Sequence, residues 1–416
     1  MKEIIKELLI WWRFKKEISS FSELIEKYNS CKESRDKKKY SVCVLPAAGP
    51  GSLGDEAMLL GMKDAFDERG VDMYPIGFYE DHSWPFLNDK IGVLPQDFAG
   101  WRIFIPKLLP FNKLYINGAD VIDGGYGIKT VESRLILAYI ASKLGLEVII
   151  TGFSFSAKAP KVLSKLYSVL GKDVKFCVRD PFSATRFSKL TGKQAQLVAD
   201  LAFMMPPKKG NYRNLHVFEW CKKNQQEGGE ILGVNICAHT ISEDRKSITP
   251  ENIESFLLVY ERALDRFLSD NENVSLVFIP HDLRGLFSDL NLALILKGKL
   301  ISKFGINRLN VLEVESSADE IKKIVSEMDY VFSGRMHLAI ASIGVSTPVA
   351  CVTYQGKFEG LYDLVGLNKL LLIQAPDFNA ESLYDVINDL KENKTIYKNI
   401  LLGSQNKLKQ YSNLNL

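Results

Sequence analysis

From Ser41 onward, short apolar runs alternate with longer amphipathic stretches along the chain. Runs of this kind, rich in β-branched residues, are typical of buried parallel strands, and the stretches between them have the length of helices. The pattern predicts strands at 41–46, 72–77, 113–117, 147–152, 175–179, 196–200, 231–237, 275–280, 310–314, 330–334, 348–354 and 369–373. Strands that alternate with helices in this way predict an α/β fold with doubly wound parallel sheets.

The strands fall into two groups of similar size. A polar segment with Pro206-Pro207 and Gly228-Gly229 separates them, and 416 residues are enough for two domains. We therefore expect two doubly wound α/β domains of similar size. The expected divisions are an arm at 1–40, a first domain at 41–205, a linker at 206–229, a second domain at 230–375 and a helical tail at 376–416.

The arm carries the positive charge of the chain. Residues 1–40 hold eleven Lys and Arg against seven Asp and Glu, whereas the remaining residues sum to −1. Apolar residues recur there at helical spacing, at Ile4, Leu8, Trp11, Phe14, Ile18, Phe21, Ile25 and Tyr28. Such a helix most often docks on its own domain or on a sister subunit of a homo-oligomer. The alternative is an anionic membrane surface, bound through Trp11, Trp12, Arg13, Lys15, Lys16 and Lys37–Lys39.

Composition excludes several classes of protein. The chain is 46% hydrophobic and 25% charged, which is the soluble-globular average, and its net charge of +3 is too weak to indicate nucleic acid as a partner. Six cysteines without a C-x-x-C pair indicate a reduced protein. The sequence starts without a signal-peptide pattern, so we expect a cytoplasmic location, with the inner face of the plasma membrane as the site of any peripheral association.

Ligands of open parallel sheets lie beyond the carboxyl ends of the strands, so the residues that follow each strand are the candidates for a site. The first strand is followed by a glycine-rich loop with Gly51, Ser52, Gly54 and Asp55. Glycines allow the backbone to approach a ligand closely. The plainer interpretation is a tight turn capped by Ser52 or Asp55. The same two interpretations apply to Asp123, Gly124 and Gly125 after the third strand.

The sharpest segment is Gly334-Arg335-Met336-His337, followed about twenty residues later by Lys357. Arg335 offers a planar fork for a carboxylate or phosphate, and His337 can exchange a proton near neutral pH. Together with Lys357 these cations suit a small, multiply charged anion. The plainer interpretation is a capped helix start with a core histidine and a surface lysine.

A metal site is a weaker alternative. His239, His281 and His337 could join Asp282 around an ion, but the chain has no H-E-x-x-H or paired-histidine spacing, so we expect no metal. A serine nucleophile is weaker still, because G-x-S-x-G does not occur.

Taken together, GSLGDEAML, NGADVIDGGYG, Arg179-Asp180, VADLAF, IPHD and SGRMHLAIASIGVSTPVACVTYQGK resemble the motifs of the polysaccharide pyruvyl transferase family, in the same order. The similarity spans roughly residues 45–361. It implies a GT-B-like fold, in which two Rossmann-like domains face a cleft. It also implies transfer of pyruvate from phosphoenolpyruvate, as co-substrate without a further cofactor, onto a sugar, oligosaccharide or lipid-linked saccharide. The expected product is a surface polysaccharide or its precursor.

At matching positions, the resemblance implies that Arg335 and His337 form the donor site together with Gly334 and Met336. It also implies that Arg179 and Lys357 contact the anionic groups of the donor. It places Gly51, Ser52, Gly54, Asp55, Asp123, Gly124, Gly125, His281 and Asp282 on the acceptor side or along the cleft. Ser52 stands where the family usually has Asn, and Met336 stands where Leu is commoner.

Two other functions remain open from the sequence. One is a GT-B glycosyltransferase that uses a nucleotide sugar, although the two glutamates eight positions apart that retaining enzymes often carry are absent between residues 330 and 370, where Glu359 stands alone. The other is a non-catalytic scaffold of a polysaccharide-assembly complex.

Overall fold

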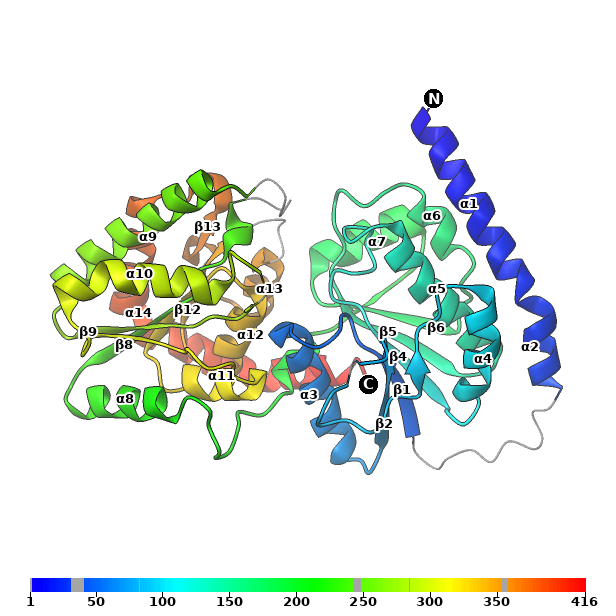
Figure 1. The fold of residues 1–416 in the computed structure, drawn as a ribbon, viewed down its shortest axis with the longest axis horizontal. Coiled ribbons are helices and arrows are strands. Elements are labelled where there is room, and N and C mark those ends of the chain that lie inside the picture. Colours follow the sequence, from blue (N-terminus) through cyan, green and yellow to red (C-terminus); the bar gives the residue numbers. More distant parts are fainter. Residues whose placement is uncertain (1, 31–40, 82, 242–247, 284, 354–357) are drawn as a thin grey trace. The chain divides into compact units, whose positions relative to one another are not determined.

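The computed structural model describes residues 2–30, 41–81, 83–241, 248–283, 285–353 and 358–416 (Figure 1). The chain divides into two compact units. Unit 1 comprises Met1–Pro50, Met58–Met204 and Gln410–Leu416, and unit 2 comprises Gly51–Ala57 and Met205–Lys409. Residues 206–229, expected to form a linker, belong to unit 2 and contain helix α8 (Leu215–Gln226).

Unit 1 is built on a parallel sheet in the order β3-β2-β1-β4-β5-β6-β7. Its strands are β1 (Ser41–Leu45), β2 (Asp72–Gly77), β3 (Gly92–Val93), β4 (Lys113–Asn117), β5 (Glu147–Phe153), β6 (Val174–Val178) and β7 (Gln196–Leu197). The two-residue strand β3 is the member that the apolar runs did not predict. The order reverses between β1 and β4, as in a doubly wound fold.

Unit 2 repeats the topology in the order β10-β9-β8-β11-β12-β13, again with parallel pairs. Its strands are β8 (Glu230–Val234), β9 (Val274–Phe278), β10 (Leu309–Val311), β11 (Tyr330–Ser333), β12 (Val349–Thr353) and β13 (Leu372–Gln374). Every residue of β9, β11 and β12 is buried, because helices cover both faces of the sheet. The two sheets confirm the predicted pair of doubly wound α/β domains.

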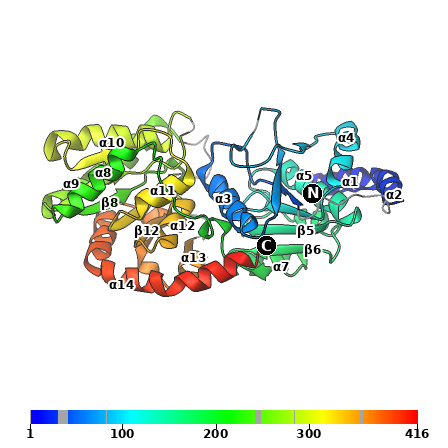
Figure 2. The same ribbon diagram turned by 90° about the horizontal axis from the view of Figure 1, so that it is seen from below.

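The helices are α1 (Lys2–Ser20), α2 (Ser22–Asn29), α3 (Leu53–Asp67), α4 (Phe98–Leu108), α5 (Ile128–Lys143), α6 (Leu163–Tyr167), α7 (Pro181–Thr191), α8 (Leu215–Gln226), α9 (Pro250–Asp270), α10 (Asp289–Phe304), α11 (Ala318–Val325), α12 (Met336–Gly344), α13 (Phe358–Val365) and α14 (Ala380–Asn413). Most of the helices connect successive strands, whereas α1 and α2 precede β1 and α14 follows β13. In unit 2, α9 packs beside α10 and beside the start of α14, where Arg266 donates to Glu381 and Tyr384 donates to Asp270, both at 2.8 Å (Figure 2). No helix among the described residues combines the length and apolar character needed to cross a membrane.

The last residues of α14 and the chain end belong to unit 1 and anchor its sheet. Asn415 accepts a hydrogen bond from the Gly152 amide at 2.9 Å and donates one to the Ala199 carbonyl at 2.9 Å. The Ser412 hydroxyl donates to the Asp200 carbonyl, also at 2.9 Å. The end of the predicted helical tail is therefore held to unit 1 by hydrogen bonds.

The N-terminal arm docks on unit 1 through α2 and the second half of α1. Phe21 is fully buried and packs on Trp101 of α4, with ring centroids 5.9 Å apart. Arg13 donates a hydrogen bond to Glu132 of α5 at 2.6 Å. The sequence pattern placed Ile4 and Leu8 on the same apolar face as Phe21, yet these two side chains are 63% and 48% exposed. Lys37–Lys39 lie outside the described residues.

Phe21→Ala should lower the free energy of unfolding by about 3–5 kcal/mol, because it leaves a cavity against α4. Leu9→Ala in the same arm should change it by less than about 0.5 kcal/mol, since Leu9 is 62% exposed. Denaturant unfolding of the full chain measures both. Equal effects of the two substitutions would mean that the arm is not docked through Phe21.

Candidate functional site

The strand order of unit 2 reverses between β8 and β11, which pair through Val234 and Phe332. Open α/β sheets bind ligands at such a switch point, beyond the carboxyl ends of the strands. Asn235 follows β8 there, and Gly334 and Arg335 follow β11. The topology therefore places the sharpest motif of the sequence where a ligand site is expected.

The backbone between β11 and α12 fixes the position of Arg335. The Ser333 hydroxyl accepts a hydrogen bond from the Arg335 amide at 3.0 Å and donates one to the Arg335 carbonyl at 2.8 Å. Gly334 is required by close packing, because a Cβ at this position would lie 2.7 Å from Cβ of Cys237. Arg335 itself is extended and immediately precedes the first turn of α12.

The guanidinium of Arg335 is clamped by Asp289 at the start of α10. Its Nε and Nη2 donate to the two carboxylate oxygens of Asp289 at 3.2 and 2.7 Å, and Nη1 lies 3.6 Å from Oδ2 of Asp282. Burial disfavours the charged form of Arg335, but the neighbouring acidic groups, Cys237 and Asp289 foremost, outweigh it and raise the pKa of Arg335. The side chain keeps a fixed orientation and is still 18% exposed.

Asp289 is the residue that sequence reasoning missed. Its side chain is fully buried, and it accepts further hydrogen bonds from Asn235 Nδ2 at 2.8 Å and from the His281 amide at 3.1 Å. Ser288 caps the helix that Asp289 begins, by accepting from the Asn291 amide. The available signals were weak: Asn235 is a polar residue in the apolar run ILGVNIC, and Ser288-Asp289 reads as an ordinary helix cap.

His337 is the second residue of α12 and is partly exposed. The backbone of Gly54 lies directly against its ring, since a Cβ at Gly54 would be 2.2 Å from Nδ1 of His337. Gly54 therefore has to be glycine for a close approach and not for a left-handed conformation. The structure thus brings the glycine-rich segment after β1 and the Arg335-His337 segment together.

Glu56, in the first turn of α3, holds the segment with Gly54 against His337. Its Oε1 accepts a hydrogen bond from the Ala318 amide at 3.1 Å, at the start of α11. Ser317, which precedes that helix, makes no side-chain cap. Burial raises the pKa of Glu56, although the Ala318 amide opposes this. A carboxylate from the first turn of α3 thus caps α11 and holds Gly54 in place.

The other predicted residues of the loop have structural contacts. Gly51 is in a left-handed conformation (φ +98°). The Ser52 hydroxyl accepts weakly from the Asp55 amide at 3.5 Å, and its carbonyl accepts from the Glu56 amide at 3.0 Å. Asp55 is mostly buried, at 9% exposure. These contacts fit the capped-turn interpretation of Ser52.

His281 and Asp282 both lie beside Arg335 and are buried. Burial, followed by the charges of His337 and Arg335, lowers the pKa of His281 to about 3. Its imidazole is therefore neutral at neutral pH. The side chain of His239 and all of Lys357 are outside the described residues, and Met336 is half-buried beside His337.

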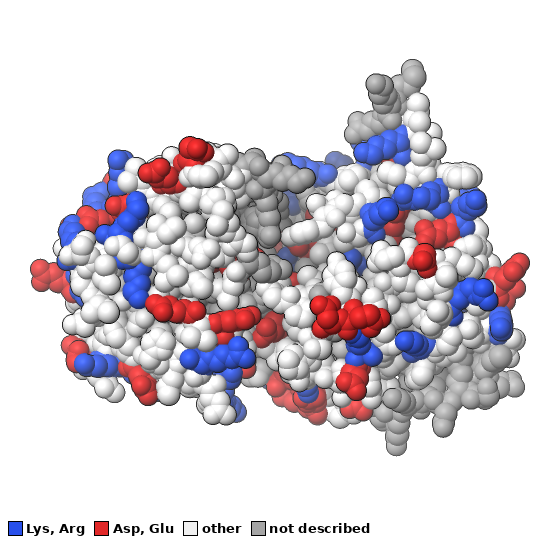
Figure 3. All heavy atoms as spheres, viewed as in Figure 1, with Lys and Arg blue, Asp and Glu red and all other residues white. Residues whose placement is uncertain are grey.

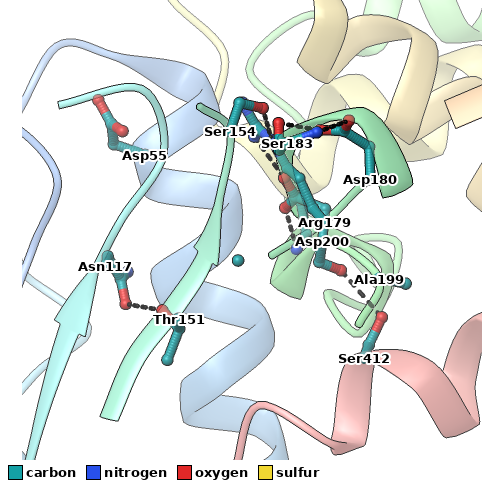
Figure 4. A network of polar contacts seen from close by, with 12 residues as sticks. Asp55, Asn117, Thr151, Ser154, Arg179, Asp180, Ser183, Ala199, Asp200 and Ser412 are labelled. Atoms are coloured by element: carbon teal, nitrogen blue, oxygen red, sulfur yellow. Dashed lines mark hydrogen bonds and ion pairs between the residues drawn. The ribbon is translucent and has the colours of Figure 1, made fainter. Parts of the chain in front are cut away.

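Arg179 occupies a different environment, in unit 1 at the end of β6 (Figure 4). Its Nη1 donates to Asp200 at 2.6 Å and its Nε donates to Ser154 at 2.8 Å, and the side chain is 3% exposed. Burial opposes its charge, but Asp200 and other acidic neighbours raise the pKa of Arg179. The guanidinium is thus held as a buried ion pair and not presented to solvent.

Asp123, Gly124 and Gly125 form the loop after β4 in unit 1. The Asp123 carboxylate accepts from the Gly125 amide at 2.9 Å and from the Ser156 amide at 3.1 Å. Gly124 is in a left-handed conformation (φ +89°) and packs on Pro160. Asp123 therefore organises the loop, in line with the turn interpretation. Across the described ranges there is no cluster of three His, Cys, Asp or Glu side chains that could hold a metal.

The sequence of the chain is similar to a known protein family. The family model described as "Polysaccharide pyruvyl transferase" matches residues 53–356. No curated protein matches the sequence significantly.

Solved structures show the fold. A Listeria monocytogenes protein assigned as a UDP-N-acetylglucosamine 2-epimerase is 12% identical, with a TM-score of 0.57 over 88% of this chain and 91% of that chain. A glycosyltransferase from Rickettsia africae is 12% identical, with a TM-score of 0.55 over 91% and 96%. The UDP-GlcNAc 2-epimerase of Neisseria meningitidis is 8% identical, with a TM-score of 0.52 over 90% and 98%. The fold is GT-B-like, and these identities show the fold alone.

The Arg335–Asp289 clamp can be tested by a double-mutant cycle. Arg335→Ala and Asp289→Ala should each destabilise the chain by about 3–5 kcal/mol, because each leaves the other charge buried and unpaired. The double variant should lose about 1–3 kcal/mol less than the sum of the two. Denaturant unfolding gives all three values, and strictly additive effects would show that the pair is not coupled.

Proposed function

The chain belongs to the polysaccharide pyruvyl transferase family, and from that premise we propose that it transfers pyruvate from phosphoenolpyruvate onto a sugar as a ketal. Phosphate is the second product, and the acceptor is a saccharide of a surface polysaccharide or of its precursor. The observation that carries the proposal is Arg335, clamped by Asp289 beside His337 at the switch point of unit 2.

Phosphoenolpyruvate carries a carboxylate and a phosphate, and either matches a guanidinium. Nε and Nη2 of Arg335 already donate hydrogen bonds to Asp289. A donor anion would therefore be bound by Nη1 of Arg335. Arg335 directly precedes α12, and a helix start favours negative charge. An anionic donor would in turn stabilise a positively charged imidazole at that helix start.

In the proposed reaction, His337 gives a proton to the methylene carbon of the donor, and positive charge develops at C2. A first sugar hydroxyl adds to C2 and loses its proton, which restores His337. The C2–O bond to phosphate then breaks, while Arg335 stabilises the departing anion. A second hydroxyl of the sugar adds to C2 and closes the ketal, and its proton leaves with the phosphate.

The remaining predicted residues receive more limited roles. We assign Arg179 to the stability of the strand ends of unit 1, because Asp200 and Ser154 engage its guanidinium. Lys357 stays a proposed third cation of the donor site on the family resemblance. Gly54 would leave space for the His337 ring, and Asp282 would share Arg335 with the donor.

His337→Ala should lower the rate of phosphate release from phosphoenolpyruvate by about 10²–10⁴-fold, because it removes the proton donor. The fold should persist, since His337 is partly exposed. The assay uses the full chain with a panel of free and lipid-linked saccharides. Binding of phosphoenolpyruvate alone, measured by calorimetry, should survive in His337→Ala and be lost in Arg335→Ala.

The matched control is His216→Ala, which removes an exposed histidine of unit 2 on α8 and should leave phosphate release unchanged. Near-normal turnover of His337→Ala would contradict the proton-donor role. Release of a nucleoside diphosphate from a nucleotide sugar, with none of phosphate from phosphoenolpyruvate, would identify a glycosyltransferase. Tight binding of phosphoenolpyruvate without any product would favour the scaffold.

A further inference from the structure

The first three turns of α1 carry a second apolar face that the described residues of unit 1 leave exposed. Its members are exposed by roughly half or more of their surface: Ile4 by 63%, Ile5 by 51%, Leu8 by 48%, Leu9 by 62% and Trp12 by 64%. At about 100° per residue these five positions form one continuous stripe on the helix. We refer to these five residues as the outer face of α1.

The outer face is distinct from the face that docks on unit 1. Phe14 and Ile18 are buried against the domain, and Ile10 and Trp11 are half-buried beside them. The two stripes are centred roughly a third of a turn apart on the helix. Exposed apolar residues scattered singly are normal on a protein surface, but five in one stripe form a contiguous patch that marks an interaction surface.

Basic side chains lie next to the outer face, and the described acidic side chains of α1 lie on the side of the domain. Lys15 and Lys16 lie one turn beyond it, one on either side, and both are exposed. The ammonium group of Lys16 lies 5.5 Å from the centre of the Trp12 ring. The described acidic side chains of α1, Glu7 and Glu17, are half-buried toward the domain, where Glu132 and Arg13 also lie. Figure 3 shows blue basic atoms next to white ones at the upper right, where α1 lies.

We propose that the outer face of α1 binds the surface of an anionic lipid membrane. An apolar stripe with an amphipathic tryptophan and flanking lysines has the chemistry of an interfacial helix, whose apolar side chains enter the headgroup region while its lysines meet anionic lipids. The docked part of the same helix holds the stripe away from the sheet of unit 1, as Figure 1 shows. This inference does not depend on the proposed transferase reaction.

Vesicle sedimentation with the full chain tests the proposal. The protein should pellet with vesicles of phosphatidylglycerol and phosphatidylcholine and much less with phosphatidylcholine alone, and salt should weaken the binding. Leu8→Glu combined with Leu9→Glu should lower partitioning by at least about tenfold, because two apolar side chains leave the bilayer. The matched control, Ile306→Glu with Leu370→Glu, changes two residues of unit 2 that are 68% and 80% exposed and should pellet like the wild type.

A second readout does not rely on charge reversal. Trp12 emission should shift to shorter wavelength on adding the anionic vesicles, and Trp12→Phe should remove that shift while circular dichroism stays unchanged. Three outcomes would overturn the proposal: no pelleting of the wild type, equal pelleting of the Leu8→Glu, Leu9→Glu variant, or a dimer that this variant dissociates without any vesicle binding. The last result would show that a second copy of the chain covers the outer face.

Discussion

The ion pair between Arg335 and Asp289 is the constraint on which the candidate site depends. A buried carboxylate is costly to desolvate, and it is tolerated because a planar guanidinium, an asparagine amide and a backbone amide together satisfy it. Three segments that follow β8, β9 and β11 thereby meet at one carboxylate. Arg335 is fixed before any ligand arrives, which is the condition for stabilising a charge without reorganisation.

The segment Gly51–Ala57, which includes the first turn of α3, gives the site its second constraint. It follows the first strand of unit 1 in sequence, yet it groups with unit 2 because Glu56 caps α11 and Gly54 packs on the His337 ring. A family motif at this loop is therefore explained by packing around the histidine. This packing does not require a phosphate-binding turn. A left-handed backbone accounts for glycine at position 51 and not at position 54.

The sequence predicted the fold well because buried parallel strands are continuous apolar runs, and twelve such runs became strands within a few residues of the expected bounds. It also placed Arg335 and His337 just beyond the end of a strand, and β11 ends at Ser333, directly before them. It did not locate Asp289, because an acid at a helix start looks like a cap. Nor could it show that Arg179 is buried against Asp200, or that Ile4 and Leu8 face away from the domain, because helical spacing and residue type do not reveal which partner covers a side chain.

The most direct test is a crystal structure of the full chain with phosphoenolpyruvate. If Arg335 and His337 form the donor site, one anionic group of the donor will lie within about 3 Å of Arg335 Nη1. Its methylene carbon will lie within about 3.5 Å of a ring nitrogen of His337, and the Asp289 clamp will be unchanged. Density for the donor away from both residues, or an Arg335 that has left Asp289 to reach it, would contradict the preorganised site.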